Sequence, residues 1–428
     1  MRAYVALGSN LGAASENLEK AAVLLRELST GKKLRASPIF RTPALLPVNG
    51  PKEWNLPFLN AVVEIEWNES PSELLGALKR TETQLGRVPS ARWAPRVIDL
   101  DLLVLGDSSF SSPELTLPHP EISRRAFVLD PWKHLAPGFR VPGTAGELSV
   151  LALSRMLSVR APLWMGIMNL TPDSFSDGGA LAFPQALSDR LARWELAGVQ
   201  AIDFGAESTR PGASTVSPEE EWARLEPALR LVRERYHGRI FRPLVSVDTR
   251  HAATAEKAIE LGAEILNDVS GLADPAFVSV LKNSSCRYVL MHSLSVPADP
   301  KIVLPPDADP VKELLGWAEK KLEVLAAAGV SRDRVIFDPG LGFGKNAAQS
   351  LELVKRAGEL EELPVPVLFG HSRKSFQRAC FGERPAQERD GFSIGISQHL
   401  ASVGVECLRV HEPQLHAEAW AAYSEVRT

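Results

Sequence analysis

The 428-residue chain has few cysteines and no strong excess of charge of either sign. Its three cysteines, Cys286, Cys380 and Cys407, are far apart and show no metal-ligand spacing. They cannot form a disulfide framework, so we expect buried thiols in a reducing compartment. A formal net charge of −4 gives no reason to expect a nucleic-acid-binding protein.

Features of membrane and exported proteins are also missing. No apolar run approaches the roughly 20 residues that cross a bilayer. The first residues, MRAYVALGSN, enter an apparent strand at once, so no signal or transit peptide is expected. We therefore expect a cytoplasmic protein that binds no membrane. The composition, 45% hydrophobic and 23% charged residues, is ordinary for a globular protein, and the length predicts two or three domains.

Two aspartates interrupt an apolar run in residues 92–103, RWAPRVIDLDLL. In a strand, Asp99 and Asp101 would project from one face, about 7 Å apart, while the apolar residues between them face the other way. Unpaired carboxylates are costly to bury, so the pair requires cations. Cationic residues flank the pair on both sides in the sequence: Arg92, Arg96, His119, Arg124 and Arg125.

Carboxylates surrounded by arginines are typical of a site for Mg²⁺ and a polyanion. Mg²⁺ is usually held by one or two carboxylates and completed by substrate phosphates. The alternative is a half-solvated edge strand with surface ion pairs, which reveal little about function. Because cationic residues occur both before and after the aspartates, we favour the phosphate site.

The first 150 residues alternate as β-α-β-β-α-β. Strands are predicted at 2–7, 33–42, 57–67 and 97–105, and helices near 14–29 and 70–85. This order predicts an α+β ferredoxin-like domain, with a sheet covered by helices on one face. A Pro- and Gly-rich stretch, PGFRVPGTAGE, follows at 137–147. We place the limits of the first domain at 1–158.

A second domain, 162–428, shows eight short apolar runs alternating with helical stretches. The predicted strands are 163–169, 200–206, 243–249, 264–269, 287–293, 334–340, 365–372 and 405–411. Eight such units over about 265 residues predict a TIM (β/α)8 barrel. A doubly wound sheet is the alternative.

Every predicted barrel strand ends on polar residues, at the edge where barrels build their active sites. A single polar strand end is often only a helix cap. Eight of eight indicate an enzyme with a polar, anionic substrate. The residues are Asn169, Glu207, Asp248, Asn267, Asp268, His292, Asp338, His371, Ser372, Arg409 and His411.

Motifs in each half resemble a known family. MGIMNLTPDSFSDGG (165–179), ESTRPGA (207–213), DPGLGFGKN (338–346), GHSRKSF (370–376) and RVH (409–411) resemble dihydropteroate synthase. YVALGSNLG (4–12), FLNAVVE (58–64), RWAPRVIDLDLL and LPHP (117–120) resemble 6-hydroxymethyl-7,8-dihydropterin pyrophosphokinase. The two enzymes catalyse consecutive steps of folate synthesis, so the resemblance implies a bifunctional transferase.

For the kinase half, the resemblance implies ATP as co-substrate and Mg²⁺ as metal. Asp99 and Asp101 would hold the metal. Phosphate-neutralising residues would be Arg92, Arg96, His119 and Arg125. The pterin pocket would be formed by Asn60, Phe58 and Phe127, with the two rings enclosing the bicycle. Asp99, Asp101 and Arg92 would be the catalytic residues of this half.

For the synthase half, the resemblance implies condensation of the pterin diphosphate with p-aminobenzoate. Pterin ligands would be Asp248, Asn267, Asp338 and Lys374. The diphosphate would be held by Arg409, His411 and an Asn169-bound Mg²⁺, with Lys374, Arg409 and His411 as catalytic residues. The p-aminobenzoate region would contain Thr209, Pro211, Phe343 and Ser372. The resemblance also allows a homodimer through the barrel domain.

Two other functions compete with this one. Methyltetrahydrofolate methyltransferases share a pterin-binding barrel, but methyl transfer has no diphosphate for the Arg409–His411 pair to hold. A scaffold with one inactive domain conflicts with the complete Asp99/Asp101 and Asp338/Lys374 sets. GLGFGKN is not a Walker A motif, because its spacing differs and Asn346 follows the lysine. The sequence leaves the conformations of loops 43–55, 170–182, 208–217 and 293–306 open.

Overall fold

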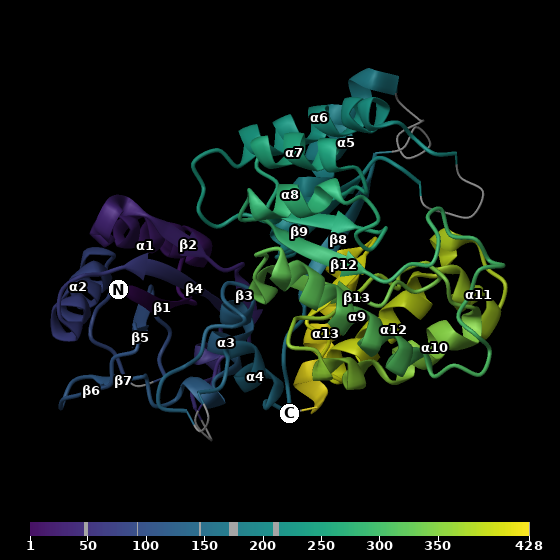
Figure 1. Cartoon of the computed structure of the whole chain (residues 1–428). Coiled ribbons are helices and arrows are strands. Elements are labelled where there is room, and N and C mark those ends of the chain that lie inside the picture. The colour runs from purple at the N-terminus through teal and green to yellow at the C-terminus, as the bar shows by residue number, and fades with distance from the viewer. Residues whose placement is uncertain (47–49, 92, 145–146, 171–178, 209–213, 428) are drawn as a thin grey trace. The chain divides into compact units, whose positions relative to one another are not determined.

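The computed structural model divides into two compact units. Unit 1 comprises Met1–Arg160 with Gly238–Arg242, and unit 2 comprises Ala161–His237 with Pro243–Thr428 (Figure 1). The functional domain limits of 158 and 162 stay a prediction. The described ranges are 1–46, 50–91, 93–144, 147–170, 179–208 and 214–427.

Unit 1 is built on an antiparallel sheet. Its strands are β1 (Arg2–Ser9), β2 (Leu34–Ala36), β3 (Phe40–Thr42), β4 (Phe58–Glu66) and β5 (Asp99–Leu105), with a separate ribbon of β6 (Phe110–Ser111) and β7 (Thr116–Leu117). The order is β2-β4-β1-β5, and β3 also pairs with β4. β1 is therefore central, and its register with β5 places Gly8 opposite Asp99.

Helices cover both faces of this sheet, whereas the sequence predicted helices on one face only. The helices are α1 (Ala14–Leu28), α2 (Pro71–Gln84), α3 (Ala126–Lys133) and α4 (Val150–Arg155). Residues of α1 and α2 share a core with one face of β1, β4 and β5. Residues of α3 and α4 bury the other face around Trp132, which contacts Tyr4. The antiparallel α+β class is confirmed, and the second helical layer is an addition to it.

The single strand predicted at 33–42 is wrong. It breaks into β2 and β3 at Ser37-Pro38-Ile39. Pro38 has no backbone N–H, so it cannot donate a hydrogen bond to a neighbouring strand. The Ser37 N–H still donates to the Val62 carbonyl at 2.9 Å, but the Val62 N–H donates to the Ser37 hydroxyl, at 2.9 Å, instead of to a backbone carbonyl. The apolar pattern continued through the interruption, so periodicity alone did not reveal it.

Unit 2 is an eight-stranded parallel barrel, as predicted. Its strands are β8 (Leu163–Asn169), β9 (Ala201–Gly205), β10 (Leu244–Asp248), β11 (Ile265–Asp268), β12 (Arg287–Met291), β13 (Val335–Asp338), β14 (Leu368–Phe369) and β15 (Cys407–Val410). The order is β13-β12-β11-β10-β9-β8-β15-β14. A bridge between Phe337 and Val367 closes the ring, with the Phe337 N–H donating to the Pro366 carbonyl at 2.8 Å.

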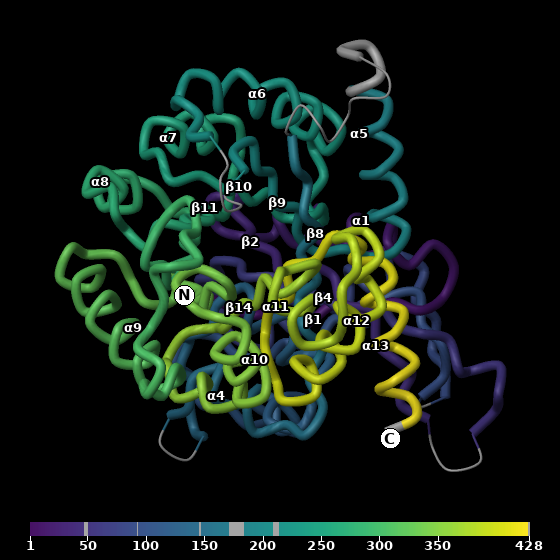
Figure 2. The backbone as a smooth tube through the Cα atoms, turned by 90° about the vertical axis from the view of Figure 1, so that its right-hand side faces the viewer, coloured from purple at the N-terminus to yellow at the C-terminus, as the bar shows by residue number. Residues whose placement is uncertain are grey.

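Helices surround the barrel strands (Figure 2). They are α5 (Gly179–Leu196), α6 (Pro218–Arg235), α7 (Ala252–Glu260), α8 (Ala276–Lys282), α9 (Pro310–Ala327), α10 (Ala347–Lys355), α11 (Ser375–Phe381), α12 (Asp390–Ser402) and α13 (Pro413–Arg427). The Ser217 hydroxyl caps α6, and the Asp309 carboxylate caps α9. Among the helices of the described ranges, none has both the length and the apolar composition of a membrane span.

Candidate active sites

The two aspartates of β5 lie on one face of the strand, as the sequence predicted. Leu100 and Leu102 are buried in the core with α1 and α2. Asp99 and Asp101 keep 23% and 33% of their side-chain surface exposed, so a ligand can reach them. Period-two alternation produces this separation, because successive side chains of a strand point to opposite faces.

Two arginines hold Asp99. Arg96 donates to Oδ2 at 2.6 Å, and Arg87 donates to Oδ1 at 2.5 Å. Arg87 also contacts Glu82, a buried residue whose carboxylate accepts the N–H of Leu100 at 2.8 Å. Sequence reasoning missed Arg87 and Glu82. Arg87 lies five residues before Arg92 in the same basic stretch, which is the signal that could have found it.

The charge state of the two aspartates differs. Burial opposes ionisation of Asp99, but Arg96 and Arg87 outweigh it and hold the Asp99 pKa below its ordinary value. Burial and the neighbouring Asp99 raise the pKa of Asp101, and His119 and Arg125 oppose this only in part. Arg125 is 3.5 Å from Asp101. The cations around the two adjacent carboxylates do not fully compensate their negative charge. Such a pair of oxygen ligands suits a divalent cation.

His119 lies close to this pair with one ring nitrogen already used. Its Nδ1 accepts the backbone N–H of Glu121 at 3.2 Å, which leaves the proton on Nε2 when the ring is neutral. Burial lowers the pKa of His119, although Asp101 opposes the shift. The structure thus brings together Asp99, Asp101, Arg96, His119 and Arg125. Arg92 lies outside the described residues.

The predicted kinase pterin residues lie on β4 and α3. Asn60 is buried and donates to the Thr42 hydroxyl at 2.8 Å. Phe58 and Phe127 are both half-buried, and no ring contact joins them among the described residues. Gly8 lies beneath this group, because a Cβ there would approach Asn60 Oδ1 to 3.2 Å and the Phe58 ring to 3.6 Å. A glycine on β1 therefore leaves room for both side chains.

In unit 2, six predicted residues line one cavity of about 30 Å³ at the carboxyl ends of the barrel strands. They are Asp248, Asn267, Asp338, Phe343, Lys374 and Arg409. Val269, Met291 and Leu341 add apolar wall. A flat, partly polar ring system suits such a lining.

Asp338 ends β13 and is buried in the floor of the cavity. Its Oδ1 accepts the Gly340 N–H at 2.7 Å, and its Oδ2 is near Gly370. Burial raises the pKa of Asp338, although the Gly340 N–H, Lys374 and Arg409 act to lower it. Gly340 has φ +64, and a Cβ there would meet the His292 carbonyl at 2.1 Å. Only glycine fits this turn.

Arg409 is held between two carboxylates. Its Nε donates to Asp203 at 2.5 Å, and its Nη2 donates to Asp248 at 2.8 Å. Burial raises the pKa of Asp248 to about 7, while Arg409 acts to lower it. Asp203, on β9, is fully buried and also accepts from the Ser246 hydroxyl and from Asn267 Nδ2.

Sequence reasoning missed Asp203. It lies in the middle of the apolar run AIDFG, where a lone buried aspartate is itself a signal of a polar network. Because a carboxylate only accepts hydrogen bonds, Asn267 must turn its amide nitrogen toward Asp203. Asn267 Oδ1 is left in a buried position with no hydrogen-bond partner among the described residues. Asn267 itself is one of the residues that line the cavity.

The remaining predicted synthase residues adjoin this cavity in part. The Ser372 hydroxyl lies 3.0 Å from His411 Nδ1. The Lys374 amine lies over the Phe343 ring, 4.4 Å from its centroid. Asn169 is half-buried at the carboxyl end of β8. Thr209 and Pro211 fall outside the described residues.

The lysine of GLGFGKN is buried and does not face a phosphate site. Its amine contacts His292 Nδ1 at 2.7 Å and the carbonyls of His292, Gly340 and Phe343 at 2.9–3.0 Å. Burial lowers the pKa of Lys345, although four surrounding acceptors suit an ammonium. Lys345 thus joins the end of β12 to the turn after β13.

One further cluster of ligand-type atoms exists among the described residues. Glu207, Glu221 and His251 bring such atoms within 4.8 Å of one another. Arg250 already occupies both oxygens of Glu207, at 2.8 and 2.9 Å. The cluster therefore has its own cation, and we assign it no metal.

Family comparisons agree with the division into two units. Residues 4–137 match the family 7,8-dihydro-6-hydroxymethylpterin-pyrophosphokinase. Residues 165–411 match the family of pterin binding enzymes. The first match begins within β1 and extends past β5, and the second begins within β8 and extends past β15, the last barrel strand.

Relatives match nearly the whole chain. A Folate synthesis bifunctional protein of Chlamydia trachomatis is 37% identical over 443 residues, covering 97% of each chain. A mitochondrial Folate synthesis bifunctional protein of Arabidopsis thaliana is 33% identical over 460 residues, covering 97% of this chain and 81% of its own.

Solved structures match the barrel. The Yersinia pestis dihydropteroate synthase in a sulfonamide drug complex is 33% identical, with a TM-score of 0.57, and covers 62% of this chain and 94% of its own. The Anaplasma phagocytophilum dihydropteroate synthase with bound 6-hydroxymethylpterin-monophosphate is 34% identical, with a TM-score of 0.55, and covers 62% and 99%.

Proposed function

The chain belongs to the folate synthesis bifunctional proteins, and on that basis we propose how its residues divide the work. It carries hydroxymethyldihydropterin pyrophosphokinase and dihydropteroate synthase activities of folate biosynthesis, both transferase reactions, and the kinase family uses ATP. The metal, the residue roles and the second substrate are inferred from the contacts within each unit.

In the kinase unit, Asp99 and Asp101 would hold Mg²⁺. Two adjacent, partly exposed carboxylates on one face of β5 support a divalent cation there, and the neighbouring Asp99 helps to raise the pKa of Asp101 in its absence. When bound, the metal would neutralise ATP phosphates. Arg96 and Arg87 already pair with Asp99, and their positive charge would also help to compensate phosphates bound there.

The kinase reaction itself needs positioning and charge compensation more than covalent help from the protein. The hydroxymethyl oxygen of the pterin attacks the β-phosphorus of ATP, and AMP leaves. Arg96, Arg125 and His119, with Arg92, compensate the phosphate charge. Phe58 and Phe127 enclose the pterin, and Asn60 binds its edge.

In the synthase unit, the arrangement of acceptors carries the proposal. Asp248, Asp338 and Asn267 all line the cavity, and Asn267 Oδ1 is a buried acceptor with no hydrogen-bond partner among the described residues. A dihydropterin presents the complementary pattern, because its 2-amino group and ring N–H groups are donors. Lys374 supplies a contrasting donor, which suits the 4-oxo group or a ring nitrogen. An acceptor-rich floor therefore fits the pterin edge.

The leaving diphosphate would be bound by Arg409, His411 and Asn169, the last through Mg²⁺. Arg409 enters this role with two of its N–H donors on Asp203 and Asp248, and its remaining donors are available for the anion. As the pterin methylene loses diphosphate, the amine of p-aminobenzoate attacks it. Phe343 and Ser372, together with Thr209 and Pro211, would line the p-aminobenzoate region.

A coupled assay tests the proposal. The protein is given ATP, hydroxymethyldihydropterin and p-aminobenzoate, and AMP and dihydropteroate are followed with and without Mg²⁺. We expect both products with Mg²⁺ and neither after chelation. AMP release that persists in chelator would remove the metal assignment at Asp99 and Asp101. A homodimer through the barrel and a cytoplasmic location also stay predictions.

A further inference from the structure

The turn after β14 carries an arginine between two proposed substrate ligands. Ser372 and Lys374 flank Arg373, which does not belong to the cavity lining. Arg373 has φ +59, a left-handed conformation that side chains other than glycine rarely adopt. Such a conformation persists only where surrounding contacts hold it.

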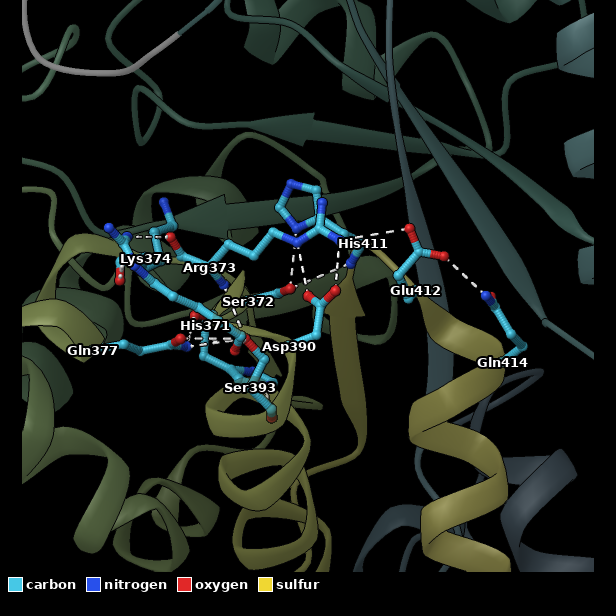
Figure 3. A network of polar contacts seen from close by, with 11 residues as sticks. His371, Ser372, Arg373, Lys374, Gln377, Asp390, Ser393, His411, Glu412 and Gln414 are labelled. Atoms are coloured by element: carbon cyan, nitrogen blue, oxygen red, sulfur yellow. Dashed lines mark hydrogen bonds and ion pairs between the residues drawn. The ribbon is translucent and has the colours of Figure 1, made fainter. Parts of the chain in front are cut away.

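The Arg373 guanidinium has two acidic partners (Figure 3). Its Nε and Nη2 donate to the two oxygens of Asp390, both at 2.7 Å. Its Nη2 is also 3.5 Å from Glu412. Asp390 begins α12, and Glu412 directly follows His411. One side chain therefore connects the turn to the start of α12 and to the segment that follows β15.

The backbone of the turn is held as well. The Arg373 N–H donates to the Ser393 hydroxyl at 3.0 Å, and its carbonyl accepts from Arg389 Nη1 at 3.1 Å. Gln377 Nε2 donates to the His371 carbonyl at 2.8 Å. These partners come from α11, from α12 and from the residue before α12. The turn is thus fixed by residues that do not belong to the cavity lining.

We propose that the Arg373–Asp390 ion pair positions the two ligands that flank it. The pair holds the left-handed turn, so that Lys374 stays over the Phe343 ring and Ser372 stays beside His411. Arg373 is a positioning residue, because it acts through its neighbours. The inference rests on the proposed roles of Lys374 and Ser372.

An ordinary surface pair would contribute little. This pair differs in two ways. It is bidentate, with Arg373 and Asp390 only 19% and 25% exposed, and it supports an unfavourable backbone conformation. Loss of the pair would release the turn rather than remove a surface contact alone.

The test compares full-length variants in both assays. Asp390→Asn removes the charge, and Arg373→Lys removes the fork but keeps the charge. Asp309→Asn is the matched control, since it weakens a similar two-contact pair with Arg356, at 3.0 and 3.2 Å, away from the cavity. Lys374→Ala reports the proposed role of Lys374 separately. The thermal unfolding of each variant is also measured.

We expect Asp390→Asn and Arg373→Lys to lower synthase kcat/KM about tenfold, with a higher KM for the pterin diphosphate and an unchanged KM for ATP. The double variant should be no worse than the more impaired single variant, because both act through one contact. Asp309→Asn should match the parent.

Parent-like kcat/KM in both folded variants, or equal loss in Asp309→Asn, would overturn the positioning role. Full activity in Lys374→Ala would instead remove the proposed ligand. If Asp390→Asn does not fold, Arg373→Lys decides.

Discussion

Asp338→Asn tests the floor of the synthase cavity most directly. The substitution keeps the size of the side chain, and the structure predicts which way the amide will turn. The Gly340 N–H needs an acceptor at 2.7 Å, so the new amide will keep its oxygen at that position. Its NH2 group then replaces Oδ2, the atom on the side of Gly370, another residue of the cavity lining.

A donor in that position meets the donors of the pterin edge. An unmatched buried polar contact costs about 1–3 kcal/mol, and more where a charge was involved. At about 1.4 kcal/mol per factor of ten, synthase kcat/KM should fall on the order of 10²-fold or more. The fold should not suffer, because burial already raises the pKa of Asp338 and the substitution removes a poorly solvated charge.

Both activities are measured on one preparation, with a thermal melt. Kinase turnover should equal that of the parent, since Asp338 lies in the other unit. A variant with an unaltered melt and synthase activity within twofold of the parent would refute the assignment. A lower melt with proportionate loss of both activities would indicate a structural role instead.

Four other expectations come from the charged groups. Asp101→Asn should abolish AMP release while synthase activity on supplied pterin diphosphate persists, and normal kinase turnover would contradict the metal assignment. Asp203→Asn should lower synthase kcat/KM about tenfold or more, because hydrogen bonds to a charged group contribute about 1.5–3 kcal/mol; calorimetry showing unchanged pterin binding would contradict it. Pterin affinity should rise as the pH rises through about 7, where Asp248 loses its proton, and Asp248→Asn should flatten that profile. Because the pKa of Asp248 is raised on folding, its contribution to stability is present below pH 3.8 and is lost as the pH approaches 7, so melts in that range should show the opposite trend.

The sequence predicted the fold class where local periodicity carried the information. β5 was found because Leu100 and Leu102 alternate with the aspartates, and the barrel strands were found because short apolar runs end on polar residues. Periodicity did not reveal the break at Pro38, because apolar residues continue on both sides of it. It also did not place α3 and α4 on the second face of the sheet, since packing over long sequence separation leaves no local pattern.

Site residues that belong to a motif could be predicted from the sequence. Residues that contact the site from distant parts of the chain were harder to predict. Six predicted residues line one cavity. Asp203 is 206 residues from Arg409, and the contact between them depends on barrel closure, which no short stretch encodes. Arg87 pairs with Asp99 across twelve residues and a loop. For such partners, the signal available in the sequence was a charged residue inside an apolar run.

The enclosed amine of Lys345 offers a natural reporter of motion at the synthase site. Acylating reagents attack neutral, accessible amines, and Lys345 is 5% exposed within a shell of carbonyls. Its labelling requires the turn after β13 to separate from His292, so the labelling rate measures how often that turn opens. A ligand that rests on Asp338 and Phe343 should slow this labelling without touching the lysine. Mass spectrometry of the peptide that contains Lys345 would then follow the opening of the pterin pocket in the full-length protein.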